Sequence, residues 1–170
     1  MINENKIRQI YKSNREQGFK MLMDSFQVPI YNYIRRLVVS HEDAEDVLQE
    51  VFIRVFRHID QFREESSLST WIYRIAYTTA ISELRRKRQE FAAIEESQIS
   101  NVSEEEVSEM LGRTSATEQL DKLEAALELL PPDERALILL FYMKEKTVEE
   151  LTVITGLGTS NIKVKLHRIR

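Results

Sequence analysis

Turn-forming residues are scarce in this chain, which contains four glycines and three prolines among 170 residues. A sheet of many strands needs a turn about every eight to twelve residues, and Gly and Pro supply much of that turn chemistry. The scarcity disfavours an extensive sheet and predicts an all-α fold. The chain also lacks cysteine, which excludes a disulfide framework, a thiolate metal site and a cysteine nucleophile.

The clearest helical pattern begins at Ser40, which together with Asp43 indicates an N-cap and an acidic first turn. Apolar residues then follow at helical spacing. They are Ala44, Val47, Leu48, Val51, Phe52, Val55, Phe56 and Ile59. We therefore predict an amphipathic helix from Ser40 to Ile59. The segment before it, up to Val39, has the same periodicity, and Pro29 is expected to kink or divide its second apolar run.

The C-terminal part has clear start and stop signals. Pro131 is expected to end one helix, and Pro132 to begin the next. Thr147 and Glu150 have the spacing of a capping box. A glycine-containing turn at 156–158 then separates two short helices, and this plan, over roughly 20 residues, is typical of a helix-turn-helix.

Charge is sorted along the chain, although the formal net charge is only −4. Stretches 41–50 and 90–118 are acidic, whereas 74–88 and 159–170 are basic. Such sorting indicates different partners for different stretches. The predicted organisation is an N-terminal domain at 1–89, an acidic linker at 90–117 and a C-terminal domain at 118–170.

The last helix presents a polar, basic side if Ile162, Leu166 and Ile169 face the core. The residues placed on or beside that side are Ser160, Asn161, Lys163, Val164, Lys165, His167 and Arg168. Such a face can lie in a DNA major groove and read base edges. A solvated amphipathic helix explains the same spacing, so periodicity alone leaves both readings open.

Two other surfaces have the same two kinds of explanation. The acidic side of the Ser40–Ile59 helix is either simply solvated or a docking surface in which Asp46, Gln49 and Glu50 bind a basic partner helix. The helix that contains Trp71 combines aromatic, hydroxyl and cationic residues, which suit unstacked bases and phosphates. The alternative, a core role, is favoured for Trp71 itself.

Catalysis has almost no support in the sequence. His41, His58 and His167 are far apart and lack the i, i+4 pairing of a helical metal site, and no glycine-rich phosphate loop is present. We expect no enzymatic activity, no metal and no cofactor. The longest apolar run, 136–143, is far shorter than the roughly 20 residues of a membrane span, and the N-terminus lacks a signal-peptide layout. A cytoplasmic protein is therefore expected.

Several separated blocks resemble the extracytoplasmic-function sigma factors of bacterial RNA polymerase. The blocks are DAEDVLQEVFIRVF from Asp43, STWIYRIAY from Ser69, LELLPPDER from Leu127, TVEEL from Thr147 and IKVKLHRIR from Ile162. The resemblance covers nearly the whole chain except the acidic linker. It implies a region 2 helical bundle and a region 4 helix-turn-helix, which direct core polymerase to specific promoters and have no catalytic activity of their own.

The resemblance also implies a role for each surface. The face with Asp46, Gln49 and Glu50 would dock on the β′ clamp helices of polymerase, and region 4 would also hold the β flap. Minus-ten DNA would be captured, with flipped bases, by Glu64, Glu65, Ser66, Ser67, Leu68, Ser69, Trp71, Arg74, Tyr77, Thr78, Arg85 and Arg86. Minus-thirty-five DNA would be read by the last helix, at Lys163, Val164, His167 and Arg168, with Ser160, Asn161 and Lys165 beside them. An anti-sigma factor, which in many relatives is membrane-bound, is a further expected partner, and it would hold the protein at the inner membrane face.

Two rival functions are consistent with parts of this pattern. A self-sufficient helix-turn-helix repressor would need a dimer interface and tight binding to duplex DNA. An acidic helical adaptor that never touches DNA would tolerate the loss of Lys163 and Arg168.

Overall fold

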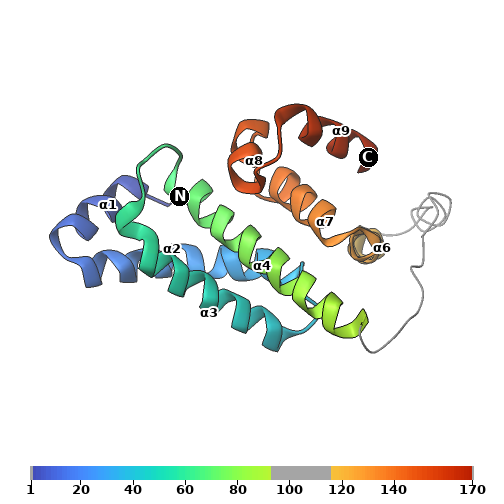
Figure 1. Cartoon of the computed structure of the whole chain (residues 1–170), viewed down its shortest axis with the longest axis horizontal. Coiled ribbons are helices and arrows are strands. Elements are labelled where there is room, and N and C mark those ends of the chain that lie inside the picture. The colour runs from blue at the N-terminus through green and yellow to red at the C-terminus, as the bar shows by residue number, and fades with distance from the viewer. Residues whose placement is uncertain (1, 93–115, 170) are drawn as a thin grey trace.

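The computed structural model describes residues 2–92 and 116–169, and within them every regular element is a helix. The all-α prediction is confirmed (Figure 1). The helices are α1 Glu4–Ser13, α2 Arg15–Arg35, α3 His41–His58, α4 Leu68–Ala92, α6 Ala116–Leu129, α7 Pro132–Ile138, α8 Val148–Thr155 and α9 Thr159–Ile169, with a 3₁₀ turn at Ile59–Gln61 and a π-helical turn at Leu139–Met143. Most of the acidic linker predicted at 90–117 lies outside the described residues.

Helices α1 to α4 form the N-terminal domain, and local side chains define where they begin. Asn3 and Asn14 cap α1 and α2 by accepting from the backbone N–H of Lys6 and Gln17. The Ser40 hydroxyl accepts from the Asp43 N–H at 3.1 Å, so the predicted N-cap of α3 is confirmed.

Pro29 does not divide its helix, because α2 runs without interruption from Arg15 to Arg35. A proline removes one backbone hydrogen bond from a helix interior. Its neighbours Phe26 and Ile30 are buried in the core, and burial of such side chains stabilises the helix by about 1.5–3 kcal/mol each. Tertiary packing therefore outweighs the local tendency of Pro29 to interrupt the helix.

The core of this domain lies where α2, α3 and α4 meet. Leu22, Val51 and Ile72 are fully buried there, and the rings of Tyr33 and Tyr73 pack edge to face with centroids 5.6 Å apart. The buried residues of α3 recur at helical spacing, so α3 is an amphipathic helix with one face on the core.

Helices α6 to α9 form the C-terminal domain, in which the predicted start and stop signals are confirmed. Pro132 begins α7. Thr147 and Glu150 bond reciprocally as a capping box ahead of α8, and α8 ends at Gly156, whose φ of 75° lies in the left-handed region that glycine adopts without strain. Helix α8, the glycine turn and α9 together make the helix-turn-helix.

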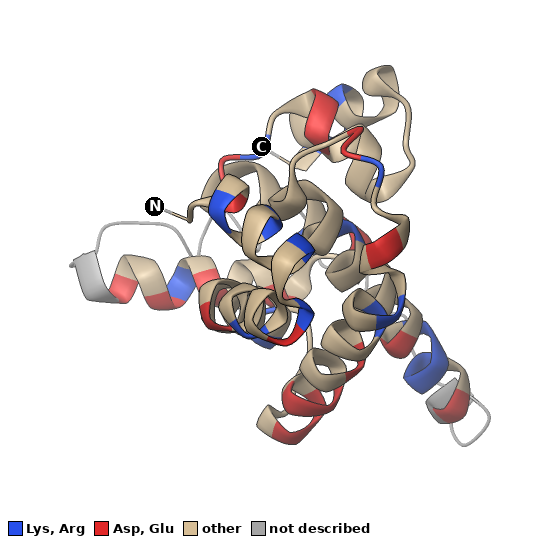
Figure 2. Ribbon diagram, turned by 90° about the vertical axis from the view of Figure 1, so that its left-hand side faces the viewer, with Lys and Arg blue, Asp and Glu red and all other residues tan. Residues whose placement is uncertain are grey.

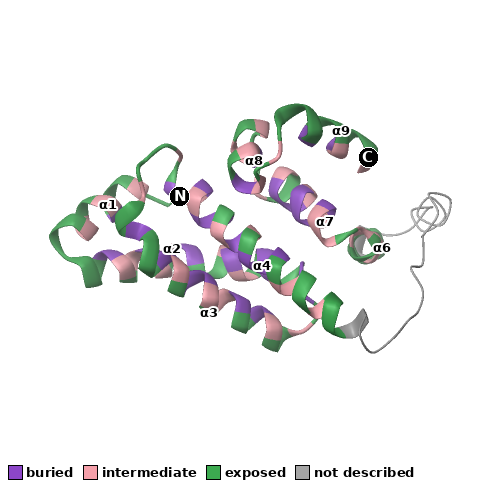
Figure 3. Cartoon of the chain, viewed as in Figure 1, coloured by how far each residue is buried: buried purple, intermediate pink, exposed green. Residues whose placement is uncertain are grey.

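The two domains pack against each other, chiefly through α4 and α8. Figure 1 shows α7 and α8 lying along α4, and Figure 3 shows buried residues along both α4 and α7. The hydroxyl of Tyr33, in α2, donates to the Ala136 carbonyl of α7 at 3.5 Å. One face of α4 is therefore covered by the C-terminal domain.

Candidate nucleic-acid and polymerase interfaces

Helices α2 and α3 form an apolar groove of about 740 Å³ on the surface of the N-terminal domain. We call it the α2–α3 groove. Its lining consists of Phe19, Met23, Gln27, Glu45, Leu48, Gln49, Phe52, Ile53, Phe56 and Arg57. Ile53 and Phe56 are 38% and 47% exposed. An exposed apolar patch with a polar rim is typical of a protein-binding surface.

The three acidic-face residues predicted from the sequence have different positions relative to this groove. Gln49 lines it. Asp46 and Glu50 are not part of its lining. Asp46 is exposed, whereas Glu50 is half-buried and accepts from Arg54 at 2.8 Å. Sequence reasoning missed the apolar lining, because it placed Phe56 in the apolar stripe of the Ser40–Ile59 helix and did not single out Ile53. The residues of α2 that complete the lining are brought to α3 only by the fold.

Acidic and basic residues are concentrated on different helices of the folded protein. Figure 2 shows acidic residues along α3 and basic residues toward the end of α4. Lys87 of α4 pairs with Asp43 of α3. Arg86 is bonded to Glu83 at 2.5 Å and to Glu90 at 2.6 Å, and the hydrogen bond with Glu83 raises the pKa of Arg86 above its ordinary value.

A second hollow, of about 380 Å³, lies between the end of α3 and one face of α4. We call it the α3–α4 pocket. Its lining consists of Arg54, His58, Gln61, Trp71, Arg74, Ile75 and Thr78. It brings together three of the residues that the resemblance places at minus-ten DNA, namely Trp71, Arg74 and Thr78. Arg54, His58 and Gln61 were missed, because they belong to a different helix end and only the fold brings them to α4.

Hydrogen bonds and a buried side chain hold the segment that leads into α4. Ser67 accepts from the Thr70 N–H at 3.0 Å and donates to the Thr70 hydroxyl at 2.9 Å. Leu68 is buried, so its side chain packs into the core. Glu65 is exposed and Ser66 half-buried. Glu64 is exposed as well, and its φ of 60° is in the left-handed region, which is uncommon for a residue other than glycine.

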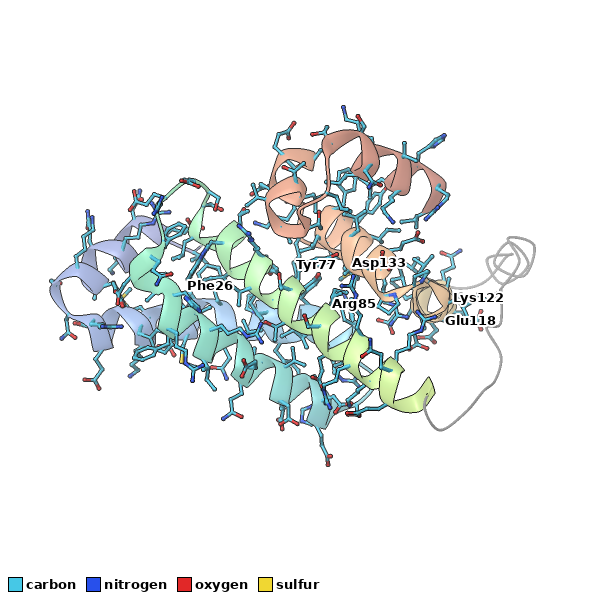
Figure 4. The ribbon with its side chains drawn as sticks, in the orientation of Figure 1. Phe26, Tyr77, Arg85, Glu118, Lys122 and Asp133 are labelled. Atoms are coloured by element: carbon cyan, nitrogen blue, oxygen red, sulfur yellow. The ribbon has the colours of Figure 1, made fainter. Side chains whose placement is uncertain are left out.

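Three other predicted residues of α4, namely Ser69, Tyr77 and Arg85, lie on the side of the C-terminal domain. The hydroxyl of Ser69 accepts from the Lys146 ammonium at 3.0 Å. Tyr77 and Arg85 of α4 lie in the part of the interface that contains Asp133 of α7 (Figure 4). Burial first, and the nearby Asp133 carboxylate second, raise the pKa of Tyr77. The predicted minus-ten residues are thus divided between two faces of α4.

Helix α9 presents most of its predicted residues to solvent. Ser160, Asn161, Lys163, Val164 and His167 are exposed. Arg168 is exposed as well, but its guanidinium donates to the carboxylate of Glu134 in α7, which is only 9% exposed. Lys165 lies 3.9 Å from the same carboxylate. A buried carboxylate needs such partners, since an unpaired buried charge is strongly destabilising.

Family models match both domains. The model described as Sigma-70 region 2 matches residues 22–90, and the model described as Sigma-70, region 4 matches residues 120–170. The ECF RNA polymerase sigma-E factor of Escherichia coli (strain K12) is 30% identical over 161 residues, which cover 91% of this chain and 84% of that protein. The chain belongs to the extracytoplasmic-function (ECF) family of RNA polymerase sigma factors. It is an initiation factor that directs core polymerase to promoters.

Another relative matches along the whole chain, and two solved structures share the fold. The ECF RNA polymerase sigma factor SigW of Bacillus subtilis (strain 168) is 27% identical over 176 residues, covering 100% of this chain and 94% of that protein. The fold is shared with CnrH in its complex with the cytosolic domain of CnrY, at a TM-score of 0.68 and 17% identity over 98% of this chain and 92% of that one. RpoE, in complex with the anti-sigma factor NepR from Bartonella quintana, has a TM-score of 0.69 and 23% identity, over 89% and 91% of the two chains.

Within residues 2–92 and 116–169 of the sigma factor, no helix is long and apolar enough to cross a membrane. In the same part of the chain, no group of His, Asp and Glu side chains could hold a metal ion.

Proposed function

We propose that this sigma factor does no chemistry itself and acts through three surfaces. The α2–α3 groove and its acidic rim bind core polymerase, the α3–α4 pocket holds a flipped base of the minus-ten element, and the exposed side of α9 reads the minus-thirty-five element. The observation that carries the proposal is the convergence of Trp71, Arg74 and Thr78 in one pocket.

The chemistry of the α3–α4 pocket suits an unstacked base with its phosphate. Trp71 is half-buried and packs on Phe62, with ring centroids 5.2 Å apart, so its orientation is fixed for stacking. Base–aromatic stacking contributes about 1–3 kcal/mol per base. Arg54 and Arg74 supply positive charge for phosphates. The Thr78 hydroxyl donates to the Arg74 carbonyl at 2.8 Å and keeps lone pairs that can accept from a base edge.

The α2–α3 groove suits an amphipathic, basic helix of polymerase. Its floor is apolar, with Phe52 buried and Phe56 partly exposed, and Glu45 and Gln49 stand at its rim. Burial of the floor would supply affinity, whereas the acidic rim would select a basic partner and set its orientation. Region 4 would bind the β flap of the same enzyme.

The exposed side of α9 supplies the minus-thirty-five contacts. Lys163 and His167 are placed to meet phosphates or base edges, and Val164, which is 64% exposed, can contact a thymine methyl. Arg168 and Lys165 divide their charge between the DNA and Glu134, so part of their role is to hold α9 on α7.

The closed packing of the two domains explains why the isolated protein would bind promoters weakly. The contact of α4 with α8 covers Ser69 and Thr70, and the formal net charge of −4 repels phosphate. Core polymerase would separate the two domains, with residues 90–117 as an acidic linker between domains 1–89 and 118–170.

An anti-sigma factor is the expected regulator of this cytoplasmic protein, held at the inner membrane face if that partner is anchored there. Support comes from the two solved relatives, each of which is in complex with another protein: CnrH with CnrY, and RpoE with the anti-sigma factor NepR. Such a partner would cover the surfaces that bind polymerase.

Abortive transcription with the cognate core polymerase on a library of genomic fragments tests the proposal. We expect start-site selection that core polymerase alone lacks, and its loss when Trp71→Ala is introduced. A stable dimer that binds duplex tightly without polymerase would favour the repressor. Retained polymerase binding without any start-site selection would favour the adaptor.

A further inference from the structure

Helix α1 contacts the segment that leads into the minus-ten helix, although it lies before the residues matched by the region 2 model. The Glu4 carboxylate accepts from the backbone N–H of Leu68 at 2.9 Å and from that of Ser69 at 3.0 Å. These are the first two residues of α4. A carboxylate at this position satisfies helix N–H groups that have no intrahelical partner and interacts favourably with the helix dipole.

The backbone N–H groups in the first turn of α4 all have partners only because Glu4 accepts from two of them. The Thr70 N–H is satisfied by the Ser67 hydroxyl at 3.0 Å, and the Trp71 N–H by the Ser67 carbonyl at 3.1 Å. Leu68 and Ser69 therefore depend on Glu4, which is 64 positions before Leu68 in the sequence. Because Glu4 belongs to a different helix, this cap couples the position of α1 to the direction in which α4 begins.

Arg8, one turn further along α1, holds the other end of the same segment. Its guanidinium is 3.6 Å from Glu4 and 3.6 Å from Glu64, and it lies over the ring of Phe62 at 5.2 Å. Phe62 in turn packs on Trp71. The strained backbone at Glu64 is thus held between two contacts with α1, and a residue in this region needs surroundings that over-determine it.

We propose that Glu4 and Arg8 are positioning residues, which fix the 62–68 segment and Trp71 for capture of the flipped minus-ten base. The inference rests on the proposed function, since it concerns how Trp71 is held in place in the α3–α4 pocket. Neither residue touches DNA. Loss of Glu4 would leave two N–H groups of α4 to water and allow the first turn to fray, so the stacking surface of Trp71 would no longer be fixed in advance.

The test uses holoenzyme and a fork-junction promoter whose minus-ten non-template strand is single-stranded, with fluorescence anisotropy as the readout. Glu4→Gln keeps the side-chain length but removes the charge, and Arg8→Gln acts on the opposite end of the segment. Glu16→Gln, an equal charge change at an exposed position in the first turn of α2, is the matched control. Each variant is also measured for affinity to core polymerase and for binding of a duplex that carries only the minus-thirty-five element.

We expect Glu4→Gln to weaken fork-junction binding about tenfold, which corresponds to about 1.4 kcal/mol. Core affinity and minus-thirty-five binding should stay within about twofold of wild type, a difference of only about 0.4 kcal/mol. Glu4→Asp, which retains the carboxylate, should recover most of the loss. Arg8→Gln should weaken fork-junction binding in the same selective way, and Glu16→Gln should have no effect.

Two results would overturn the inference. One is fork-junction binding by folded Glu4→Gln and Arg8→Gln that equals wild type. The other is a parallel loss of fork-junction binding and core affinity, which would mean that α1 only stabilises the domain. If wild-type holoenzyme itself shows no preference for the minus-ten single strand over an unrelated strand, the proposed function fails before the variants are compared.

Discussion

The Lys146 ammonium of the C-terminal domain donates a hydrogen bond to the Ser69 hydroxyl of the N-terminal domain, at 3.0 Å. Lys146 is only 9% exposed. It lies 3.5 Å from Glu150 and over the ring of Tyr73 at 5.2 Å. Glu150 in turn accepts from the Thr70 hydroxyl at 2.9 Å. A small charged network therefore holds α8 against the first turn of α4, on the helix that we assign to promoter melting.

Replacement of Lys146 by methionine should loosen the closed arrangement. The variant keeps a similar length and apolar stem but loses the bond to Ser69, and a hydrogen bond to a charged group contributes about 1.5–3 kcal/mol. Because the chain has no cysteine, dyes can be attached at introduced cysteines, Gln27→Cys and Ser160→Cys, for energy transfer between the domains. We expect lower transfer efficiency in Lys146→Met than in the exposed control Lys20→Met. Equal efficiency would show that apolar packing alone keeps the domains closed.

The same contact should depend on acidity through Glu150. Burial opposes ionisation of this carboxyl, but the Thr147 N–H, the Thr70 hydroxyl and Lys146 together lower its pKa below the ordinary 4.5. A lowered pKa means that stabilisation is present above that ordinary value and is lost as the pH falls through the pKa of the folded protein. Of these three interactions of Glu150, only the hydrogen bond from Thr70 crosses between the domains. Protonation of Glu150 therefore weakens domain closure by only a part of the stabilisation that is lost.

We therefore expect energy transfer to stay constant from neutral pH to about 4.5, the ordinary pKa of Glu, and to fall below it. Glu150→Gln should remove this pH-dependent step. A step of unchanged size in Glu150→Gln would assign the transition to other carboxyl groups.

Charge reversal on α3 should weaken association with core polymerase. In Asp46→Lys/Glu50→Lys, two acidic residues of the α3 face that carries Gln49 become cations and would repel a basic partner helix. The partly exposed Glu50–Arg54 pair is worth at most about 1 kcal/mol of folding stability. We expect a loss of affinity on the order of tenfold, or about 1.4 kcal/mol, measured by equilibrium competition for core polymerase. Glu42→Lys, in the first turn of the same helix, is the control. Unchanged holoenzyme formation by the folded double variant would count against this docking surface.

Two basic residues of α9 should respond differently to truncation. Arg168→Ala leaves the buried Glu134 carboxylate with Lys165 as its remaining nearby cation, and an under-paired buried charge costs about 1–3 kcal/mol. We expect a lower midpoint of thermal unfolding in addition to weaker promoter binding. Lys163→Ala, at an exposed position, should weaken promoter binding and reduce its salt dependence without a change in the midpoint.

Addition of Glu134→Gln separates these two effects of Arg168→Ala. The double variant has no uncompensated charge, so it should recover stability but not promoter affinity. Recovery of both would mean that Arg168 has only a structural role.

Gly18 allows α1 and α2 to approach closely, and its replacement should be costly. A Cβ at this position would lie 2.6 Å from the Tyr11 backbone nitrogen, closer than packed atoms approach, so α1 must move. Overpacking of this kind costs about 1–3 kcal/mol. We expect Gly18→Ala to lower the free energy of unfolding by that amount in urea titrations, whereas Gly158→Ala, where a Cβ meets nothing within 4 Å, should have a small effect. Equal stabilities would show that α1 adjusts at no cost.

Local interactions account for what could be predicted from the sequence alone. The cap at Ser40, the capping box of Thr147 and Glu150, and the turn at Gly156 each involve residues within a few positions of one another. Helical periodicity is local as well. The same logic was incomplete at Pro29, because burial of Phe26 and Ile30 depends on α3 and α4 and not on the neighbouring sequence.

The amino-acid sequence by itself determined the helices, their caps, the helix-turn-helix and the membership of a sigma-factor family. Only the tertiary structure decided which side of α4 is covered, that His58 and Gln61 join Trp71 in one pocket, and that Glu4 caps a helix that begins at Leu68. The physical reason is the range of the interactions. Periodicity and capping act over one or two turns, whereas contacts between residues 64 to 80 positions apart exist only after the helices have packed.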